Sequence, residues 1–229
     1  MSIFDNLQFP KIIYEVESKY NGKIYIVQIG DTRKIRVDNT NQSISHFSPL
    51  CKNLVWGKVA QVLKDNEPDL KNVMILGLGG ATMQHLIAQA YPGIKILSVE
   101  IDPVMVDIAK KFFDLDLIQN HKIIVDDAMR VVVEPEKYEI AEYSFQALVV
   151  DIYVGERYPD LGKSGNFIAA LKRLVVPGGL IIFNRIYWEH HQDEVNAFIE
   201  YISENLNDVK NLVIAGYTNS DNVLIFGRT

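Results

Sequence analysis

The sequence predicts an α/β fold: a doubly wound, mostly parallel sheet of seven strands, preceded by a small antiparallel β meander. Three observations predict it. Apolar and polar residues alternate in short bursts near the N-terminus, compact apolar runs recur from residue 72 onward, and amphipathic stretches with helical spacing separate those runs. Continuous apolar runs of this kind are typical of parallel strands that are covered on both faces.

The composition sets limits on what the chain does. Its 229 residues, 48% of them apolar, suffice for one sizeable core and a small appendage. A net charge of −6 without a stripe of Lys and Arg argues against nucleic acid as the partner. One cysteine excludes an internal disulfide, and we find neither a secretion signal nor an apolar run long enough to cross a bilayer. We therefore expect a cytoplasmic protein without membrane contact.

The meander is predicted over residues 11–40. Asn21-Gly22 and Gly30-Asp31 separate its bursts, and both dipeptides suit tight hairpin turns. Its outer strand would be an unpaired edge unless another chain or domain covers it. For this reason, and because of the family resemblance given below, we expect a homodimer.

The chain divides by pattern into two parts. We assign residues 1–48 to a small N-terminal β domain and residues 49–229 to the α/β domain, with a connecting helix in 49–70. The clearest helix start in the second part is Asp102-Pro103, an N-cap followed by proline. The seven apolar runs predicted as strands are Val73–Leu76, Ile94–Val99, Lys122–Val125, Ala147–Val150, Leu180–Phe183, Leu212–Ala215 and Asn222–Phe226.

A glycine loop follows the first of these strands. Gly77, Gly79 and Gly80 lie between the strand and a helix, where a ligand can approach the backbone and the helix N-terminus. Such glycines also serve close packing of a helix on a strand. Thr82 stands where the dinucleotide fingerprint requires glycine, which disfavours NAD.

Two carboxylates at the next strand ends suit an adenosine. Glu100 ends the second strand, where an acid can accept both ribose hydroxyls. Asp127 ends the third strand and can accept the adenine amine, while the neighbouring Ala128 amide faces the ring. Asp126 is the alternative to Asp127, and a helix cap is a competing or additional role for Asp127.

Asp151 follows the fourth strand at the mouth of the crevice, which makes it the candidate acid–base or amine-binding residue. The loop that follows is dense in tyrosine, glycine and charge, and we interpret it as a lid or acceptor wall; a plain surface loop is the alternative. The residues that we assign to it are Tyr153, Glu156, Tyr158 and Asp160.

Two apparent motifs do not hold. Gly155 and Gly162 are separated by six residues, not by the four of a phosphate-binding loop. Glu189-His190-His191 is better explained as a solvated helix start, and the other histidines make no ligand spacing. We predict no metal.

Taken together, these motifs resemble the spermidine synthase (polyamine aminopropyltransferase) family, within the Rossmann-like class I fold of AdoMet-dependent methyltransferases. The resemblance covers most of the chain. It implies that Gln42 contacts the donor nucleoside, that Glu100 holds the ribose and that Asp151 deprotonates or positions an acceptor amine. The implied cofactor is S-adenosylmethionine or its decarboxylated form.

The sequence departs from the family at the acceptor. Gly80 replaces the acid that holds the donor's aminopropyl ammonium, Val154 replaces a second aspartate, and Val55-Trp56 aligns near a Tyr-His pair of the diamine pocket. An unpaired buried ammonium is costly, so these losses disfavour a dication such as putrescine. Loss of the acid near Gly80 also removes repulsion toward the carboxylate of AdoMet.

Four functions remain on this basis. The first is an AdoMet-dependent transferase, with methyl transfer to a small-molecule acceptor, an amine among the candidates. The second is aminopropyl transfer with Glu156 or Asp160 replacing the missing acids. The third is a nucleoside-binding or assembly module without catalysis, and the fourth, an NAD-linked oxidoreductase, is disfavoured.

Overall fold

A computed structural model gives the structure of the chain and contains two β-sheets, one of seven strands and one of four, so the predicted fold class is confirmed. The residues that it describes are 9–38, 40–153, 158, 165–187, 191–215 and 222–229.

The larger sheet is mostly parallel. Its strands are β5 (Asn72–Leu76), β6 (Lys95–Glu100), β7 (His121–Val125), β8 (Phe145–Val150), β9 (Val175–Ile186), β10 (Asn207–Ile214) and β11 (Asn222–Arg228). They lie in the order β10-β11-β9-β8-β5-β6-β7. The five strands from β7 to β9 are parallel, and β11 and β10 add an antiparallel pair at one edge. The order reverses at β5, so the crevice for a ligand is expected at the carboxyl end of β5.

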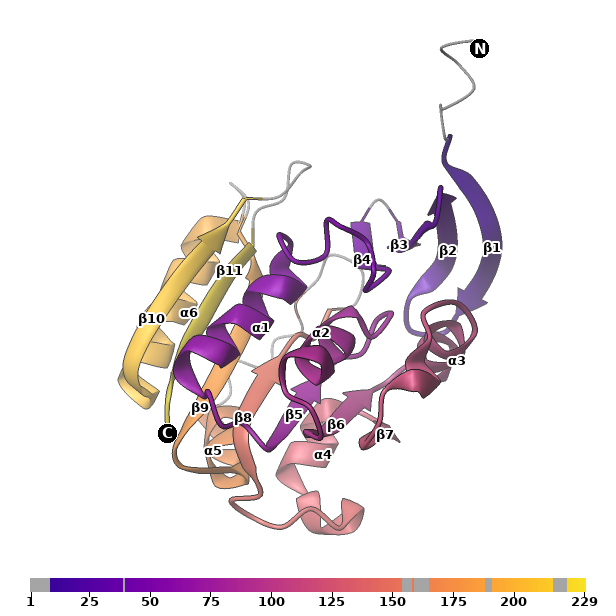
Figure 1. Ribbon diagram of the computed structural model, residues 1–229. Coiled ribbons are helices and arrows are strands. Elements are labelled where there is room, and N and C mark those ends of the chain that lie inside the picture. The colour runs from indigo at the N-terminus through magenta and orange to yellow at the C-terminus, as the bar shows by residue number, and fades with distance from the viewer. Residues whose placement is uncertain (1–8, 39, 154–157, 159–164, 188–190, 216–221) are drawn as a thin grey trace.

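Helices cover both faces of this sheet (Figure 1). They are α1 (Val55–Asn66), α2 (Thr82–Ala90), α3 (Pro103–Phe112), α4 (Ala128–Val133), α5 (Gly165–Leu174) and α6 (Gln192–Asn205), with short 3-10 turns at Leu115–Leu117 and Pro135–Tyr138. Side chains of α1, α2 and α3 share one apolar core with the sheet, and those of α4, α5 and α6 share the other. Among the described helices none is long and apolar enough to span a bilayer.

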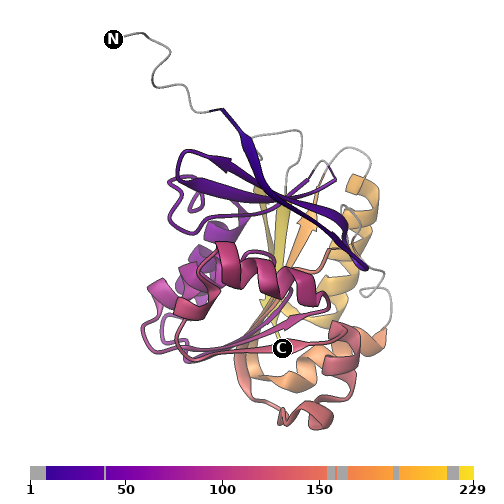
Figure 2. The ribbon, with the colours of Figure 1, turned by 90° about the vertical axis from the view of Figure 1, so that its right-hand side faces the viewer.

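The smaller sheet is an antiparallel meander. Its strands are β1 (Lys11–Ser18), β2 (Gly22–Ile29), β3 (Thr32–Val37) and β4 (Thr40–Ile44), in that order. The predicted turns separate β1 from β2 and β2 from β3, whereas the polar strand β4 has no apolar pattern that could reveal it. Figure 2 shows the meander lying across one end of the larger sheet, over α3. Apolar residues of β2 and β3 pack against α3 there.

Polar side chains fix the meander to the larger sheet. The Asp102 carboxylate caps α3 by accepting from Val104 N (3.0 Å), which confirms the predicted cap, and also accepts from Ser18 and from Asn21 Nδ2 (2.6 Å). The Thr82 hydroxyl donates to the carbonyl of Ile44. These contacts explain why Thr82 occupies a position where a dinucleotide-binding loop has glycine.

Residues 176–179, where Pro177-Gly178-Gly179 favours a turn, interrupt the β8–β9 ladder. The register passes from Phe145 opposite Val175 directly to Ala147 opposite Leu180. Gly178 has φ of +76°. The turn is thus a bulge inside the long strand β9, so β9 begins before the apolar run that predicted it.

Candidate active site

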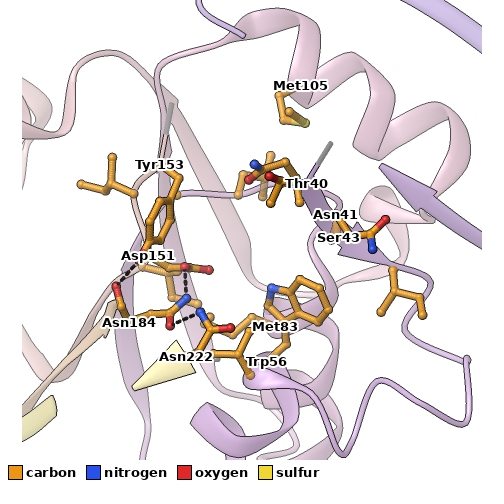
Figure 3. A pocket seen from close by; sticks show the side chains of 18 of the residues that line it. Thr40, Asn41, Ser43, Trp56, Met83, Met105, Asp151, Tyr153, Asn184 and Asn222 are labelled. Carbon is orange, nitrogen blue, oxygen red and sulfur yellow. Dashed lines mark hydrogen bonds between the residues drawn. The ribbon is translucent and has the colours of Figure 1, made fainter. Parts of the chain in front are cut away.

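A cavity of about 320 Å³ lies between the carboxyl ends of β5, β6 and β8 and strand β4 of the meander (Figure 3). Most of the residues proposed from the sequence line it: Gln42, Gly77, Gly79, Glu100, Asp127, Ala128, Asp151 and Tyr153. Glu156 and Asp160 lie outside the described residues.

The glycine loop brings two strand ends together. Gly77 has φ of +105°, and a Cβ there would lie 2.1 Å from the carbonyl oxygen of Asp151. Glycine is therefore required at this point by the close approach of β5 and β8. Close backbone packing, the alternative explanation for the glycine loop, therefore accounts for Gly77. The backbone of Gly77 also borders the cavity, so both roles apply to it.

Gly80 does not belong to the cavity lining. A Cβ at this position would lie 2.9 Å from Ser43 Oγ and 3.0 Å from Phe113 Cδ1. It would thus point into the contact between β4 and the end of α3. An acid at position 80 could not be accommodated in this arrangement without displacement of Ser43 and Phe113.

Glu100 presents its carboxylate at the floor of the cavity. Its Oε2 accepts from Leu78 N at 3.1 Å and its Oε1 accepts from Asp102 N at 2.9 Å. Burial raises the pKa of Glu100 to about 7, and the two backbone amides oppose that rise. A carboxylate offers about four lone-pair sites, so roughly two remain for hydroxyl donors.

Asp127 is favoured over Asp126 as the second carboxylate. Asp127 Oδ1 accepts from Met129 N at 2.7 Å, which makes Asp127 the N-cap of α4, and the residue also lines the cavity. Asp126 is used elsewhere, since it accepts from Arg130 Nη1 (3.0 Å) and from the Tyr138 hydroxyl (2.7 Å). The helix cap and a ligand contact are therefore compatible roles for Asp127.

Asp151 lies at the other end of the cavity, just after β8. Its Oδ1 accepts from Asn184 Nδ2 at 2.7 Å, and Asn184 Oδ1 accepts from Asn222 Nδ2 at 3.0 Å (Figure 3). Burial raises the pKa of Asp151, and the hydrogen bond from Asn184 opposes this rise. Among the described residues, none donates a hydrogen bond to Oδ2 of Asp151.

The two described tyrosines of the predicted acceptor wall differ. Tyr153 lines the cavity with its ring, but its hydroxyl donates to the Asn184 carbonyl (3.0 Å) and accepts from Ile186 N (2.8 Å). Burial raises the pKa of Tyr153 well above its ordinary value, so its phenol stays neutral. Tyr158 does not line the cavity; its ring stacks on the Arg185 guanidinium at 3.9 Å.

Sequence reasoning missed several lining residues, among them Asn184, Asn222 and, as a side chain facing the site, Trp56. Figure 3 shows the Trp56 indole directed into the cavity. Asn184 left one signal, a polar residue directly after the apolar run Leu180–Phe183. Asn222 begins its strand and left none.

The cavity is suited to an organic ligand. No group of three or more His, Cys, Asp or Glu that could hold a metal ion is found among the described residues. The rings of His46 and His85 stack at 3.9 Å, but His85 Nε2 is bonded to the Phe113 carbonyl (2.9 Å) and burial lowers its pKa to about 4. His85 is thus buried in packing contacts, and the partly exposed His46 lies 3.6 Å from the Asp114 carboxylate.

Comparison with known proteins gives two kinds of relative. No family model matches the chain. It is 26% identical over 68% of its length to an eEF1A lysine and N-terminal methyltransferase homolog of Drosophila pseudoobscura, of which it covers 24%. It is also 26% identical over 95% of its length to a probable polyamine aminopropyl transferase of Bifidobacterium longum, of which it covers 47%. The chain spans less than half the length of these curated relatives.

Solved structures show the same fold. A probable spermidine synthase from Corynebacterium glutamicum superposes with a TM-score of 0.76 at 19% identity, over 95% of this chain and 80% of that one. Human methyltransferase-like protein 13, in complex with SAH, gives a TM-score of 0.57 at 19% identity, over 76% of this chain and 80% of that one.

Proposed function

The chain is a spermidine synthase-like protein of the class I methyltransferase fold, and from this premise we propose that it transfers a methyl group from AdoMet to an amine of a small-molecule acceptor. One observation carries the proposal. The carboxylates of Glu100 and Asp151 border a single cavity, one beside the glycine loop and the other with an oxygen left open.

The residues at the glycine-loop end fit an adenosine. Glu100 is held by two backbone amides and keeps lone pairs for the two ribose hydroxyls. Asp127 and Ala128 border the same end, at the start of α4, where a carboxylate and an amide can meet an adenine edge. Gln42 reaches the cavity from the meander. When bound, AdoMet supplies an electrophilic methyl group on its sulfonium.

Two features favour AdoMet over its decarboxylated form. Gly80 carries no acid, and a Cβ there would meet Ser43 and Phe113, so no carboxylate at this position repels the carboxylate of AdoMet. Lys34 is the sole Lys or Arg among the described residues that line the cavity. A cation at the cavity wall is attractive to a donor that carries a carboxylate.

Asp151 then has the role of handling the acceptor amine. Its open Oδ2 can accept an N–H from the amine, orient the nitrogen and take its proton. Trp56 and Met83 give the cavity apolar walls near the reaction site. Such walls limit access of water and hold the reactants close, which supplies most of the rate in a direct displacement.

Aminopropyl transfer is the second candidate. The match to the Bifidobacterium protein, which extends over 95% of this chain, favours it. It requires further acids for a polyamine precursor, and Glu156 and Asp160 are the candidates. A nucleoside-binding module without catalysis is the third candidate, and the open Asp151 oxygen argues against it.

The test is a transfer assay on the full chain. Methyl-labelled AdoMet and aminopropyl-labelled decarboxylated AdoMet are each incubated with a panel of monoamines and diamines, and products are followed by mass spectrometry. We expect methylated amines from AdoMet and none from an Asp151→Asn control. Aminopropylated product alone would establish the second candidate, and no product from either donor, with adenosine binding intact, would favour the third.

We also propose that two copies of the chain associate through the meander. Within the described residues β1 pairs only with β2, so its other edge is open. Phe9, just before β1, and Ile12 of β1 are 69% and 62% exposed. Light scattering should give twice the monomer mass and Ile12→Lys should reduce it; a monomeric wild type would refute the proposal.

A further inference from the structure

We propose that Asn184 and Asn222 are positioning residues that act in series on Asp151: they orient its carboxylate and stabilise the form that accepts a proton. This inference rests on the role of Asp151 in the proposed function. It assigns two residues of β9 and β11 to the acceptor end of the site, although neither lies in the motif around Asp151.

The three side chains form one continuous chain of hydrogen bonds. Asn222 Nδ2 donates to Asn184 Oδ1 at 3.0 Å, and Asn184 Nδ2 donates to Asp151 Oδ1 at 2.7 Å (Figure 3). All three residues line the cavity, and Asn184 is only 3% exposed. We call this chain of hydrogen bonds the relay. It runs from Asn222 at the cavity wall, through the buried carboxamide of Asn184, to the carboxylate of Asp151.

The direction of this relay depends on the charge of Asp151. An ionised carboxylate only accepts, so Asn184 must present its Nδ2 to Asp151. Its Oδ1 then faces Asn222, which must donate in turn. Protonated Asp151 does not require this order. Both amides are thus aligned to favour the ionised form, and buried hydrogen bonds in series strengthen one another.

The surroundings keep Asn184 from turning away. The Tyr153 hydroxyl donates to the Asn184 backbone carbonyl at 3.0 Å and accepts from Ile186 N at 2.8 Å, which fixes this part of β9 beside the end of β8. The backbone of Asn184 is therefore fixed beside Asp151, and its carboxamide is held by the hydrogen bonds to Asp151 and Asn222. With Oδ1 of Asp151 engaged by Asn184, Oδ2 is the oxygen left for the acceptor amine.

The other charged and titratable groups do not replace the relay. Tyr153 and Tyr158 are buried phenols with raised pKa values and stay neutral. Arg185 of β9 stacks on Tyr158 and pairs with Glu194 at 3.1 Å. From the other elements around the cavity the described ionisable groups are Lys34, Glu100 and Asp127. None of these has a hydrogen bond to Asp151 among the described residues, whereas Asn184 does.

The test is a direct titration of Asp151 by NMR in the full chain labelled with ¹³C at aspartate carboxyls. Asp151→Asn identifies the signal by its loss. We expect Asn184→Ala to raise the titration midpoint of Asp151 by about one to two pH units, since one hydrogen bond to a charged group is lost. Asn222→Ala should raise it by a smaller amount, and Asn211→Ala, an exposed asparagine on β10, should leave it unchanged.

Asn222→Asp sharpens the test. An ionised aspartate there can only accept, so two carboxylates compete for Asn184 Nδ2, and the midpoint of Asp151 should rise further than with alanine. This variant and Asn222→Ala keep the test valid if Asn184→Ala fails to fold. An Asp151 midpoint that is unchanged or lowered in both Asn222 variants would overturn the inference.

The titration needs neither donor nor acceptor, so its result is independent of the transfer assay. If methyl transfer is absent while the Asn222 variants shift Asp151, the proposed function fails and the relay stands. If transfer occurs, Asn222→Ala should move the acid limb of the kcat/KM profile upward by the same amount, with AdoMet affinity unchanged. Transfer with an unmoved acid limb would contradict the relay.

Discussion

The two ends of the cavity are built in different ways. At the donor end, Glu100 and Asp127 come from strand ends and are held by backbone amides within a few residues along the chain or on the adjacent strand. At the acceptor end, Asp151 is held by side chains more than thirty residues away, from β9 and β11. The donor end is thus fixed by local backbone geometry, and the acceptor end by tertiary contacts.

This difference has a consequence for function. A backbone N–H is lost only on substitution by proline, so the hydrogen bonds of the donor end depend little on which side chains supply the amides. The acceptor end depends on individual side chains such as Asn184, Asn222 and Trp56, each of which a single substitution can replace. We infer that the acceptor end is where relatives of this fold diverge in what they modify.

The largest expected effect is at Asp151. Asp151→Asn keeps the size of the side chain but removes the proton acceptor, so turnover should fall by roughly 10²–10⁴-fold. AdoMet affinity should change little, because the contacts proposed for the nucleoside are at the other end of the cavity. Turnover by the variant equal to that of the wild type would remove Asp151 from the mechanism.

The next effect in size is at Glu100. Glu100→Ala should weaken AdoMet binding by at least about a hundredfold, because two hydrogen bonds to a charged acceptor are lost, each worth roughly 1.5–3 kcal/mol. Isothermal titration calorimetry measures it. Asp126→Ala, next to Asp127 but outside the cavity lining, is the matched control and should bind normally. Normal binding by Glu100→Ala would refute the ribose assignment.

The pH dependence of binding follows from the same residue. Burial raises the pKa of Glu100 to about 7, so the protonated form grows as the pH falls below that value. Ribose hydroxyls bind best to the ionised carboxylate, so AdoMet affinity should decrease by up to about tenfold per pH unit below 7. Above 7 it should level off. Glu100→Gln should abolish this dependence, and a wild-type affinity constant from pH 5 to 8 would contradict the assignment.

The smallest effect concerns the junction between the two sheets. Thr82→Val keeps the shape of the side chain and removes the hydroxyl that bonds to Ile44 and lies 2.7 Å from Ser43 Oγ. The free energy of unfolding should fall by about 1–3 kcal/mol, since a buried carbonyl loses its donor. Urea denaturation measures it, with Thr32→Val in the meander as the control. Equal loss in both variants would show that the junction contributes nothing particular.

The architecture was predictable because it depends on apolar runs and on a helix cap that can be recognised in the sequence. Seven apolar runs gave the seven strands, and Asp102-Pro103 gave the start of α3. Strand β4 was not predicted, because it is polar and is held by its neighbour β3 and by Thr82, not by an apolar face of its own. The early start of β9 was missed for a different reason, since its bulge at 176–179 contains Pro and Gly, which are typical of turns.

The site was predictable only at the donor end. Glu100 and Asp127 could be placed because the carboxyl ends of adjacent parallel strands must meet. The position of Gly80 could not be judged, since the direction of its missing Cβ depends on the contact between Ser43 and Phe113. Asn184 and Asn222 acquire their role through the antiparallel pairing of β9 with β11, which places them close together. No local sequence pattern predicts that Asn184 and Asn222 become neighbours when β9 pairs with β11.

The most direct measurement of the central claim is a thermal-shift comparison of AdoMet, decarboxylated AdoMet, methylthioadenosine and NAD on the wild-type chain. A ligand that binds the native state raises the unfolding midpoint, by about 5–10 °C at a concentration one hundred times Kd. We expect the largest shift with AdoMet, and its loss in Glu100→Ala. A larger shift with NAD, or no shift with any of the adenosine ligands, would contradict the account.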